Sequence, residues 1–370
     1  MAAPAGSEIP RWVDYLLVPL VNLAVALLLS GLVVIAIGAN PLDALDSLVF
    51  GAVGYPEAIG FTLYYATNFV FTGLAVAVAF HAGLFNIGGE GQAYIGGLGV
   101  GLVCLALDQW PLVLVFPIAV AAAALFGAAW AFIPAYLQAK RGSHIVITTI
   151  MFNFIASALM TYLLVDVLVQ PGQQAPRSRD FAPEAWLPYA KDLMNAIGID
   201  IGEPPLNLSS LLAVLACVLV WLFIWHTRWG YELRTVGHSE RAARYAGISR
   251  PRAIVLAMLI SGALAGMVGV NDIMGVHHYL LVGWTGGVGF VGIAVALMGR
   301  NHPVGIAMAA LLFGALYQGG SEIAFDIPQI TKEMVVVIQG LVILFCGALE
   351  NMFKPQIAAL FRRRAVAEAA

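Results

Sequence analysis

Residues 111–137, PLVLVFPIAVAAAALFGAAWAFIPAYL, decide the fold, because this stretch contains no Asp, Glu, Lys or Arg. An apolar run of about 20 residues is long enough to cross the hydrocarbon core of a bilayer as one helix. Nine other apolar runs lie between polar breaks along the chain. The pattern predicts spans at residues 16–38, 58–80, 92–107, 111–137, 144–168, 208–226, 253–275, 284–299, 303–320 and 333–350.

The composition indicates the same class of protein. Hydrophobic residues make up 61% of the 370 residues, charged residues make up 11%, and the mean hydropathy is +0.89. This apolar content exceeds what the core of a water-soluble domain can bury. We therefore expect an all-α polytopic membrane protein with about ten transmembrane helices in one domain over residues 1–370. The net charge of −3 gives no indication of a nucleic-acid partner.

Lys and Arg residues concentrate on one side of the predicted spans. If the spans alternate in direction, the loop 228–252 with its six Arg residues faces the same side as Arg300. Short cytoplasmic loops carry an excess of Lys and Arg, so this side is predicted to be cytoplasmic, with both termini. The loop 169–207 is then extracytoplasmic, either as a docking site or as an irregular spacer. Other basic residues on the cytoplasmic side are Lys140, Arg141 and Arg362–Arg364.

Two predicted spans, residues 92–107 and 284–299, are short; a cluster of glycine precedes the first, and a cluster of glycine lies at the start of the second. Interrupted helices at matching places in two halves of a transporter often form a site near the middle of the membrane. We therefore expect two short or broken helices and an inverted repeat with halves 58–168 and 250–350.

Polar residues accompany the first glycine cluster. Asn86 precedes the short helix and can cap its free N–H groups, while Glu90 in the first turn suits the helix dipole. A carboxylate at membrane depth usually faces a cavity or a polar partner, so Glu90 is either a structural residue or a ligand group. Glycines can instead serve close helix packing, as we expect for Gly262 and Gly266.

The loop 228–252 contains a predicted short helix. Ser239 is a typical N-cap residue, and Gly247 is typical of the position after a helix end. Glu240 and Arg244 lie one turn apart between them. Such a helix suits contact with a cytosolic protein, whereas the alternative is an ordinary basic loop that sets topology or contacts anionic lipid.

Motifs for catalysis, nucleotide binding and metal binding are absent from the sequence. No G-x-x-x-x-G-K-[ST] sequence occurs, so ATP would have to be bound by a partner. No H-E-x-x-H spacing occurs, and His277-His278 is interpreted as a structural or interfacial pair. Gly287-x-Gly289-x-x-Gly292 matches a dinucleotide fingerprint by letter, but that motif requires a preceding strand. We therefore expect no enzyme activity, no cofactor and no metal.

Four segments carry a family resemblance, in the same order along the chain. They read FNIGGEGQ (85–92), TTIMFN (148–153), GHSERAARYAGI (237–248) and GIAVALMGRNHP (292–303). With these segments the chain resembles the permease subunits of bacterial ATP-binding cassette (ABC) importers. Within them it most resembles the branch that serves nucleosides and simple sugars, related to the ribose and branched-chain amino acid permeases. The resemblance covers about residues 58–350.

The resemblance implies a permease dimer, of one or two kinds of chain, in the inner membrane on two ATP-binding subunits. It also implies an extracytoplasmic binding protein, often a lipoprotein. The segment 237–248 would be the coupling helix that contacts the ATPase, through Gly237, Ser239, Glu240, Ala242, Ala243, Arg244 and Gly247. One residue departs from the pattern, since Ile145 stands where many relatives carry Glu.

For the substrate pathway we expect amide, hydroxyl and carboxylate groups, which suit the hydroxyls and base edges of a nucleoside. The candidates are Asn86, Glu90, Gln92, Thr149, Asn153, Asn271 and Asp272. Any of them can instead hold helices together. A second hypothesis is an ion-coupled secondary transporter of a small polar solute, without the segment 237–248 as a functional part. Its ion sites would be Glu90, Asp272, Glu322 or Asp326.

Overall fold

The computed structural model describes residues 13, 17–170 and 172–345, and all regular secondary structure within them is helical. Seven segments are long and apolar enough to cross a membrane, and three shorter apolar helices accompany them. The long segments are α3 (Pro56–His81), α4 (Gly89–Leu107), α5 (Leu112–Tyr136) with η2 (Leu137–Arg141), α6 (Ile145–Tyr162) with η3 (Leu163–Val167), α8 (Ser209–His226), α11 (Arg250–Gly266) with η5 (Val270–His277), and α13 (Pro303–Asp326). The shorter helices are α1 (Val18–Ala36), α12 (Val288–Met298) and α14 (Lys332–Ile343). Each predicted span overlaps one of these segments, which confirms an all-helical membrane fold, and the count of about ten crossings remains a prediction.

The sequence analysis missed the helix α2 (Pro41–Val53). Its 13 residues are too few to cross a bilayer, and Asp43 and Asp46 interrupt its apolar pattern. Leu42 is 72% exposed, so part of its apolar surface is not covered by the chain. The end of the predicted span 333–350 and Arg362–Arg364 lie outside the described residues. Three other short helices are α7 (Ala190–Ala196), α9 (Arg228–His238) and α10 (Glu240–Tyr245).

The chain divides into two compact units, residues 1–51 with 319–370 and residues 52–318. In the first unit, α1, α2, α14 and the end of α13 share an apolar core of Val34, Ala44, Ile323, Ile330, Val335 and Ile338. The predicted repeat halves 58–168 and 250–350 remain a prediction.

Three helices form the centre of the second unit. The apolar windows of α3, α4 and α11 are 78%, 67% and 67% buried, whereas those of α5, α6 and α8 are 22%, 17% and 28% buried. The helices α3, α4 and α11 therefore form the buried core of this unit. The outer three leave apolar surface that this chain does not cover.

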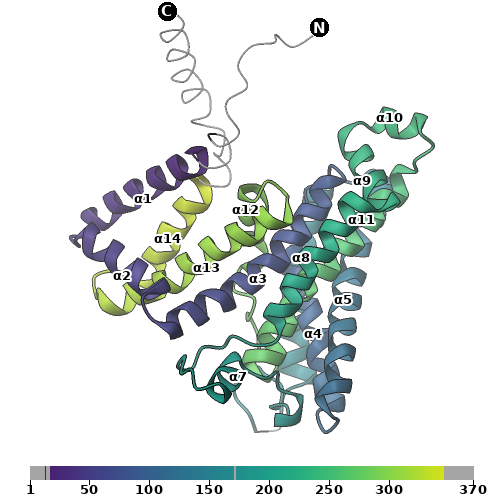
Figure 1. Cartoon of the computed structure of the whole chain (residues 1–370). Helices are drawn as coiled ribbons and strands as arrows, with labels where there is room; N and C mark the ends of the chain where they lie inside the picture. Colours follow the sequence, from purple (N-terminus) through teal and green to yellow (C-terminus); the bar gives the residue numbers. More distant parts are fainter. Residues whose placement is uncertain (1–12, 14–16, 171, 346–370) are drawn as a thin grey trace, which may run out of the picture. The chain divides into compact units, whose positions relative to one another are not determined.

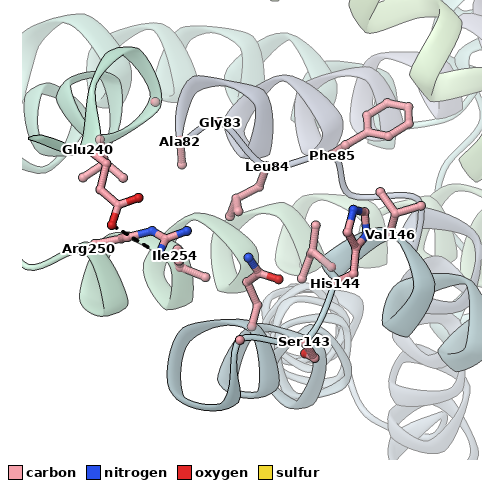
Figure 2. Close-up of a pocket in the computed structure, with 15 residues that line it drawn as sticks. Ala82, Gly83, Leu84, Phe85, Ser143, His144, Val146, Glu240, Arg250 and Ile254 are labelled. Atoms are coloured by element: carbon pink, nitrogen blue, oxygen red, sulfur yellow. Dashed lines mark ion pairs between the residues drawn. The ribbon is translucent and has the colours of Figure 1, made fainter.

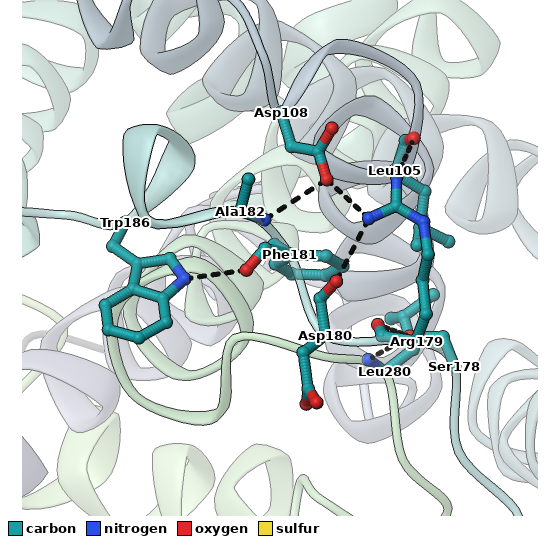
Figure 3. Close-up of polar contacts among 9 residues, drawn as sticks. All are labelled: Leu105, Asp108, Ser178, Arg179, Asp180, Phe181, Ala182, Trp186 and Leu280. Carbon is teal, nitrogen blue, oxygen red and sulfur yellow. Dashed lines mark hydrogen bonds and ion pairs between the residues drawn. The ribbon is translucent and has the colours of Figure 1, made fainter. Parts of the chain in front are cut away.

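The segment 172–207 is anchored at the end of this unit that carries α7, opposite α10 (Figure 1). Figure 3 shows that Asp108, which follows α4, accepts hydrogen bonds from the Arg179 guanidinium and from the Ala182 N–H at 3.1 Å. Arg179 also donates to the Leu105 carbonyl at 2.7 Å. Burial acts to raise the pKa of Asp108, but the hydrogen bonds from Arg179 and Ala182 hold it below its usual value. An ionised Asp108 therefore fixes this segment to α4.

The same segment is joined to the residues that follow η5. Ser178 and Leu280 exchange two hydrogen bonds of 2.9 Å, and the Trp186 indole stacks on the His278 imidazole at 4.0 Å between ring centroids. Burial, and secondarily the neighbouring His277, lower the pKa of His278 to about 4. The ring is therefore neutral near pH 7, which suits its stacked position.

The glycines of α11 lie where two helix backbones meet, as the sequence predicted. A Cβ atom on Gly262 would lie 2.4 Å from the Gly127 carbonyl oxygen on α5. A Cβ atom on Gly266 would lie 2.2 Å from the Ala123 carbonyl oxygen. Only the absence of a side chain permits this approach, which is a common device for packing membrane helices.

We expect Gly262→Val to destabilise the protein by about 1–3 kcal/mol, because the new side chain must push α5 away from α11. The measurement is the thermal unfolding midpoint of the purified protein in detergent. The matched control is Gly340→Val, since a Cβ atom at Gly340 meets open space. Equal midpoints for the two variants would contradict the packing described here.

Candidate functional site

Two non-helical segments interrupt the second unit and bring two helix N-termini together. Residues 82–88 separate α3 from α4, and residues 278–287 separate η5 from α12. A Cβ atom on Gly289, in the first turn of α12, would lie 2.1 Å from the Glu90 nitrogen in the first turn of α4. The short helix predicted at 284–299 is present as α12, whose 11 residues are too few to cross a bilayer, but the short helix predicted at 92–107 is wrong, because α4 begins at Gly89 and its 19 residues are long enough. The first turns of α4 and α12 are in direct contact.

Glu90 joins these two helix starts. One carboxylate oxygen accepts a hydrogen bond from the Gly287 N–H at 2.9 Å, and the other accepts from the Gly289 N–H at 2.8 Å. Gly287 has φ 89°, a left-handed conformation that glycine adopts readily. Because the N-terminus of a helix carries partial positive charge, one carboxylate between two such ends stabilises both. Glu90 thus caps α12 from a position on α4, a partnership that the sequence did not predict.

Asn86 ties the segment 82–88 to the central helices. Its side-chain oxygen accepts from the Gly88 N–H at 2.9 Å, which confirms the predicted cap. Its amide nitrogen donates to the Gln92 side chain at 2.9 Å and to the Ser261 hydroxyl at 2.8 Å. Ser261 in turn donates to the Ala75 carbonyl on α3 at 2.6 Å. Asn86, Gln92 and Ser261 are buried, so these bonds replace solvation that the groups have lost.

The helix α6 holds the same region from the other side. The Asn153 oxygen accepts from the Gly91 N–H at 2.9 Å, and its nitrogen donates to the Ile87 carbonyl at 3.0 Å. Thr149, one turn earlier, is buried and donates to the Ile145 carbonyl of its own helix at 2.8 Å. Ile145, in place of the acid expected from the family pattern, is also buried.

Asn271 and Asp272 belong to a separate polar group. The Asp272 carboxylate accepts from the Tyr64 hydroxyl at 2.7 Å and from the Asn68 side chain at 2.8 Å. Asn271 donates to the Asn68 oxygen at 2.8 Å. This group joins the π-helix η5 to α3 inside the second unit.

The sequence analysis did not single out the partners in this group. Tyr64 and Asn68 lie four residues apart inside an apolar span, a signal that could have identified them. Asn207 and Ser209 donate to the Asn271 oxygen at 2.9 and 2.7 Å, but they lie at a loop boundary where polar residues carry no such signal.

The short helix predicted after Ser239 is confirmed as α10. It lies next to α9, at the end of the second unit opposite α7 (Figure 1). The Ser239 hydroxyl accepts from the Ala242 N–H at 3.3 Å, and Gly247 follows the helix with φ 73°. Ala243 is buried, whereas Arg244, one turn after Glu240, is exposed. α10 is thus a compact projection with an exposed outer face.

The helix α9 connects this projection to the first interrupted segment. A Cβ atom on Gly237, in the last turn of α9, would lie 2.3 Å from the His81 carbonyl oxygen. A Cβ atom on Gly83 would lie 3.2 Å from the Gly237 Cα. His81 also donates from its ring to the Asn301 carbonyl at 3.0 Å. The end of α9 therefore packs on the start of the segment 82–88.

The seven candidate pathway residues thus form two groups. Asn86, Glu90, Gln92, Thr149 and Asn153 surround the start of α4, and Asn271 and Asp272 lie with Tyr64 and Asn68. Each of the seven makes a hydrogen bond within the protein, and their contact with a solute remains a prediction. Among the described residues, no group of three or more His, Cys, Asp or Glu side chains is arranged to hold a metal ion.

We expect Glu90→Ala to lower the free energy of unfolding by about 2 kcal/mol, because two partly buried N–H groups, of Gly287 and Gly289, lose their acceptor. Glu90→Gln should cost less, since the amide oxygen can still accept one bond. The measurement is thermal unfolding in detergent, with Glu184→Ala at an exposed turn as the control. If Glu90→Ala unfolded at the same temperature as the control, the capping role would be wrong.

Comparison of the sequence with known proteins assigns the chain to a family. The sequence model described as branched-chain amino acid transport system / permease component matches residues 58–347. The guanosine ABC transporter permease protein NupP of Bacillus subtilis is 36% identical, over 90% of this chain and 94% of that protein. The glucose permease TsgB13 of Haloferax volcanii is 34% identical, over 96% and 93%.

The nucleoside ABC transporter permease protein NupB of Lactococcus lactis is also 34% identical, over 89% of this chain and 90% of that protein. The matched region contains both interrupted segments, the residues around Glu90 and the projection α10. A multi-pass helical fold, a family match over most of the chain and relatives of nearly equal length agree. The chain belongs to the permease family of the branched-chain amino acid transport systems.

Proposed function

We propose that this chain is the permease subunit of an ABC importer that carries nucleosides, or related simple sugars, inward with energy from a partner ATPase. The names of its relatives support the substrate class, since they include permeases for guanosine, for nucleosides and for glucose. The observation that carries the proposal is α10, a capped and exposed helix whose neighbour α9 packs on the start of the segment 82–88.

The basic residues support a cytosolic position for the end of the second unit that carries α10. Lys140 and Arg141 end η2, and the loop 228–252 with its six Arg residues contains α9 and α10. By the positive-inside rule this end faces the cytosol, with both chain termini on the same side. The anchored segment 172–207 then faces outward, where a binding protein or lipoprotein docks.

The contacts supply a route from the ATPase to the helix starts. Closure of the ATPase pair on ATP would move α10 together with α9. The close contact of Gly237 with His81 and Gly83 passes that movement to the segment 82–88. This segment leads directly to Glu90, which holds the first turn of α12. Two arrangements of this joint would give the outward-facing and inward-facing states.

A second permease of a different kind completes the dimer in this proposal. In Bacillus subtilis the guanosine permease NupP is 36% identical to this chain, and the guanosine permease NupQ is 26% identical. In Lactococcus lactis the nucleoside permeases NupB and NupC are 34% and 27% identical. A chain that resembles one member of each pair more closely is expected to have a partner of the other type. The weakly buried helices α5, α6 and α8 offer apolar surface for this partner and for lipid.

The second candidate function is an ion-coupled secondary transporter, and Asp272 is the observation that favours it. This carboxylate is buried, and its hydrogen-bond donors, Tyr64 and Asn68, are neutral. Buried carboxylates with such surroundings serve as proton or sodium sites in membrane carriers. A carrier of this type would work without an ATPase and would not depend on α10.

The two functions differ in their response to changes on α10. We expect Arg244→Glu and Tyr245→Ala to reduce co-purification of the ATPase and to reduce uptake of labelled guanosine at least tenfold, because both side chains are exposed on the projection. The measurement uses cells that express the complete transporter. Arg141→Glu is the matched control, since it makes the same charge change on an exposed residue outside α10. Uptake that persists in both α10 variants, with no ATPase recovered by the wild type, would favour the ion-coupled carrier.

A further inference from the structure

A cavity of about 540 Å³ lies between α10, the segment 82–88, the start of α11 and the connection from α5 to α6. Figure 2 shows Leu84 and Ser143 on opposite sides of this space, with the ion pair of Glu240 and Arg250 at one edge. Pockets that bind small molecules have volumes of roughly 300–1,000 Å³. The space therefore suits a ligand of nucleoside size.

Two polar atoms in the lining lack partners. The side-chain oxygens of Gln138 and Ser143 are buried and have no hydrogen-bond partner among the described residues. A buried polar atom without a partner is costly, and such atoms are rare in folded proteins. Both oxygens can accept from hydroxyl or amino groups, and Ser143 can also donate. Neither oxygen is exposed to the space in this arrangement, so a polyhydroxy molecule would bond to them after the Gln138 or Ser143 side chain rotates toward it.

The charges of the lining favour a neutral ligand. The Glu240 carboxylate lies 3.3 Å from the Arg250 guanidinium, so these two opposite charges are paired with each other. Leu84, Ile145 and Ile254 supply apolar walls. A phosphorylated ligand would meet the Glu240 carboxylate and could gain a cation only by drawing Arg250 out of the ion pair or from the His144 imidazole, whereas a neutral nucleoside or sugar needs neither.

The position of the cavity determines what an occupant would do. Its walls include Gly83 and Gly237, the two glycines through which α9 contacts the segment 82–88. Any relative movement of α10 and the segment 82–88 changes the shape of the space. A ligand that fits one arrangement therefore stabilises that arrangement against the other.

We propose that this cavity is an inhibitory site on the cytosolic side for a neutral molecule of the transported class, a nucleoside or a simple sugar. A bound ligand fixes the contact between α9 and the segment 82–88 in one arrangement. ATP-driven import then slows when the solute has accumulated inside the cell. The inference rests on the proposed function, because the ligand is taken from the same chemical class as the transported solute.

The test uses the complete transporter in proteoliposomes whose ATPase side faces the bath, with guanosine-loaded binding protein in the lumen. Guanosine, ribose or guanosine monophosphate is added to the bath with ATP, and ATP hydrolysis and release of labelled guanosine are measured. We expect bath guanosine or ribose to inhibit both rates at least threefold and the monophosphate to leave them unchanged. In Gln138→Leu/Ser143→Ala the half-inhibiting concentration should rise at least tenfold.

The matched control is Gln170→Leu/Ser157→Ala, which makes the same chemical changes at two exposed positions outside the cavity. A second measurement needs no variant: bath 8-azidoadenosine, after illumination of the wild type, should label residues 137–146 or 82–85. If the loaded binding protein stimulates ATP hydrolysis, but bath guanosine and ribose do not inhibit it and bath 8-azidoadenosine labels neither segment, the inhibitory site alone is overturned. Inhibition that is unchanged in the cavity variant, without labelling there, would also overturn it. No stimulation by any nucleoside-loaded or sugar-loaded binding protein would overturn the proposed function as well.

Discussion

The constraint on which the site depends is the meeting of two helix N-termini inside an apolar protein. α4 and α12 both begin next to Glu90, and each beginning leaves N–H groups that need acceptors. Water would satisfy such groups at a surface, but a membrane interior supplies none. The Glu90 carboxylate and the Asn86 side chain supply these acceptors instead. The two non-helical segments, 82–88 and 278–287, are stable inside the protein only because Glu90 and Asn86 lie beside them.

Close contacts between backbones at Gly289 and Gly237 connect the two helix N-termini to the rest of the unit. Gly289 admits the Glu90 backbone, and Gly237 admits the end of α3 at the other end of the segment 82–88. Neither contact leaves room for a side chain. When one of the two backbones in a contact moves, the other must therefore move with it. The segment 82–88 therefore behaves as a short link between α9 and α12. In the proposed importer, this link would pass movement of the ATPase to the start of α12.

Much of the fold could be predicted from the sequence, because apolar length and glycine position act locally. The spans, the Asn86 cap and the helix after Ser239 each depend on residues within a few positions of one another. The partners of Glu90 and Asp272 could not be predicted, since Gly287 and Tyr64 lie about 200 residues away in the chain. Glu240 likewise pairs with Arg250 across a turn rather than with Arg244 on its own helix. The helix α2 was missed because its two Asp residues conceal an apolar surface.

The central claim is that α10, the segment 82–88 and the start of α12 move as one connected unit. Hydrogen–deuterium exchange of the complete wild-type transporter, with and without trapped ATP, tests it most directly. The account predicts that protection changes together in residues 237–247, 82–91 and 283–292, while the packed contact of α5 with α11 stays unchanged. A change confined to residues 237–247, with the other two segments unaltered, would contradict the account.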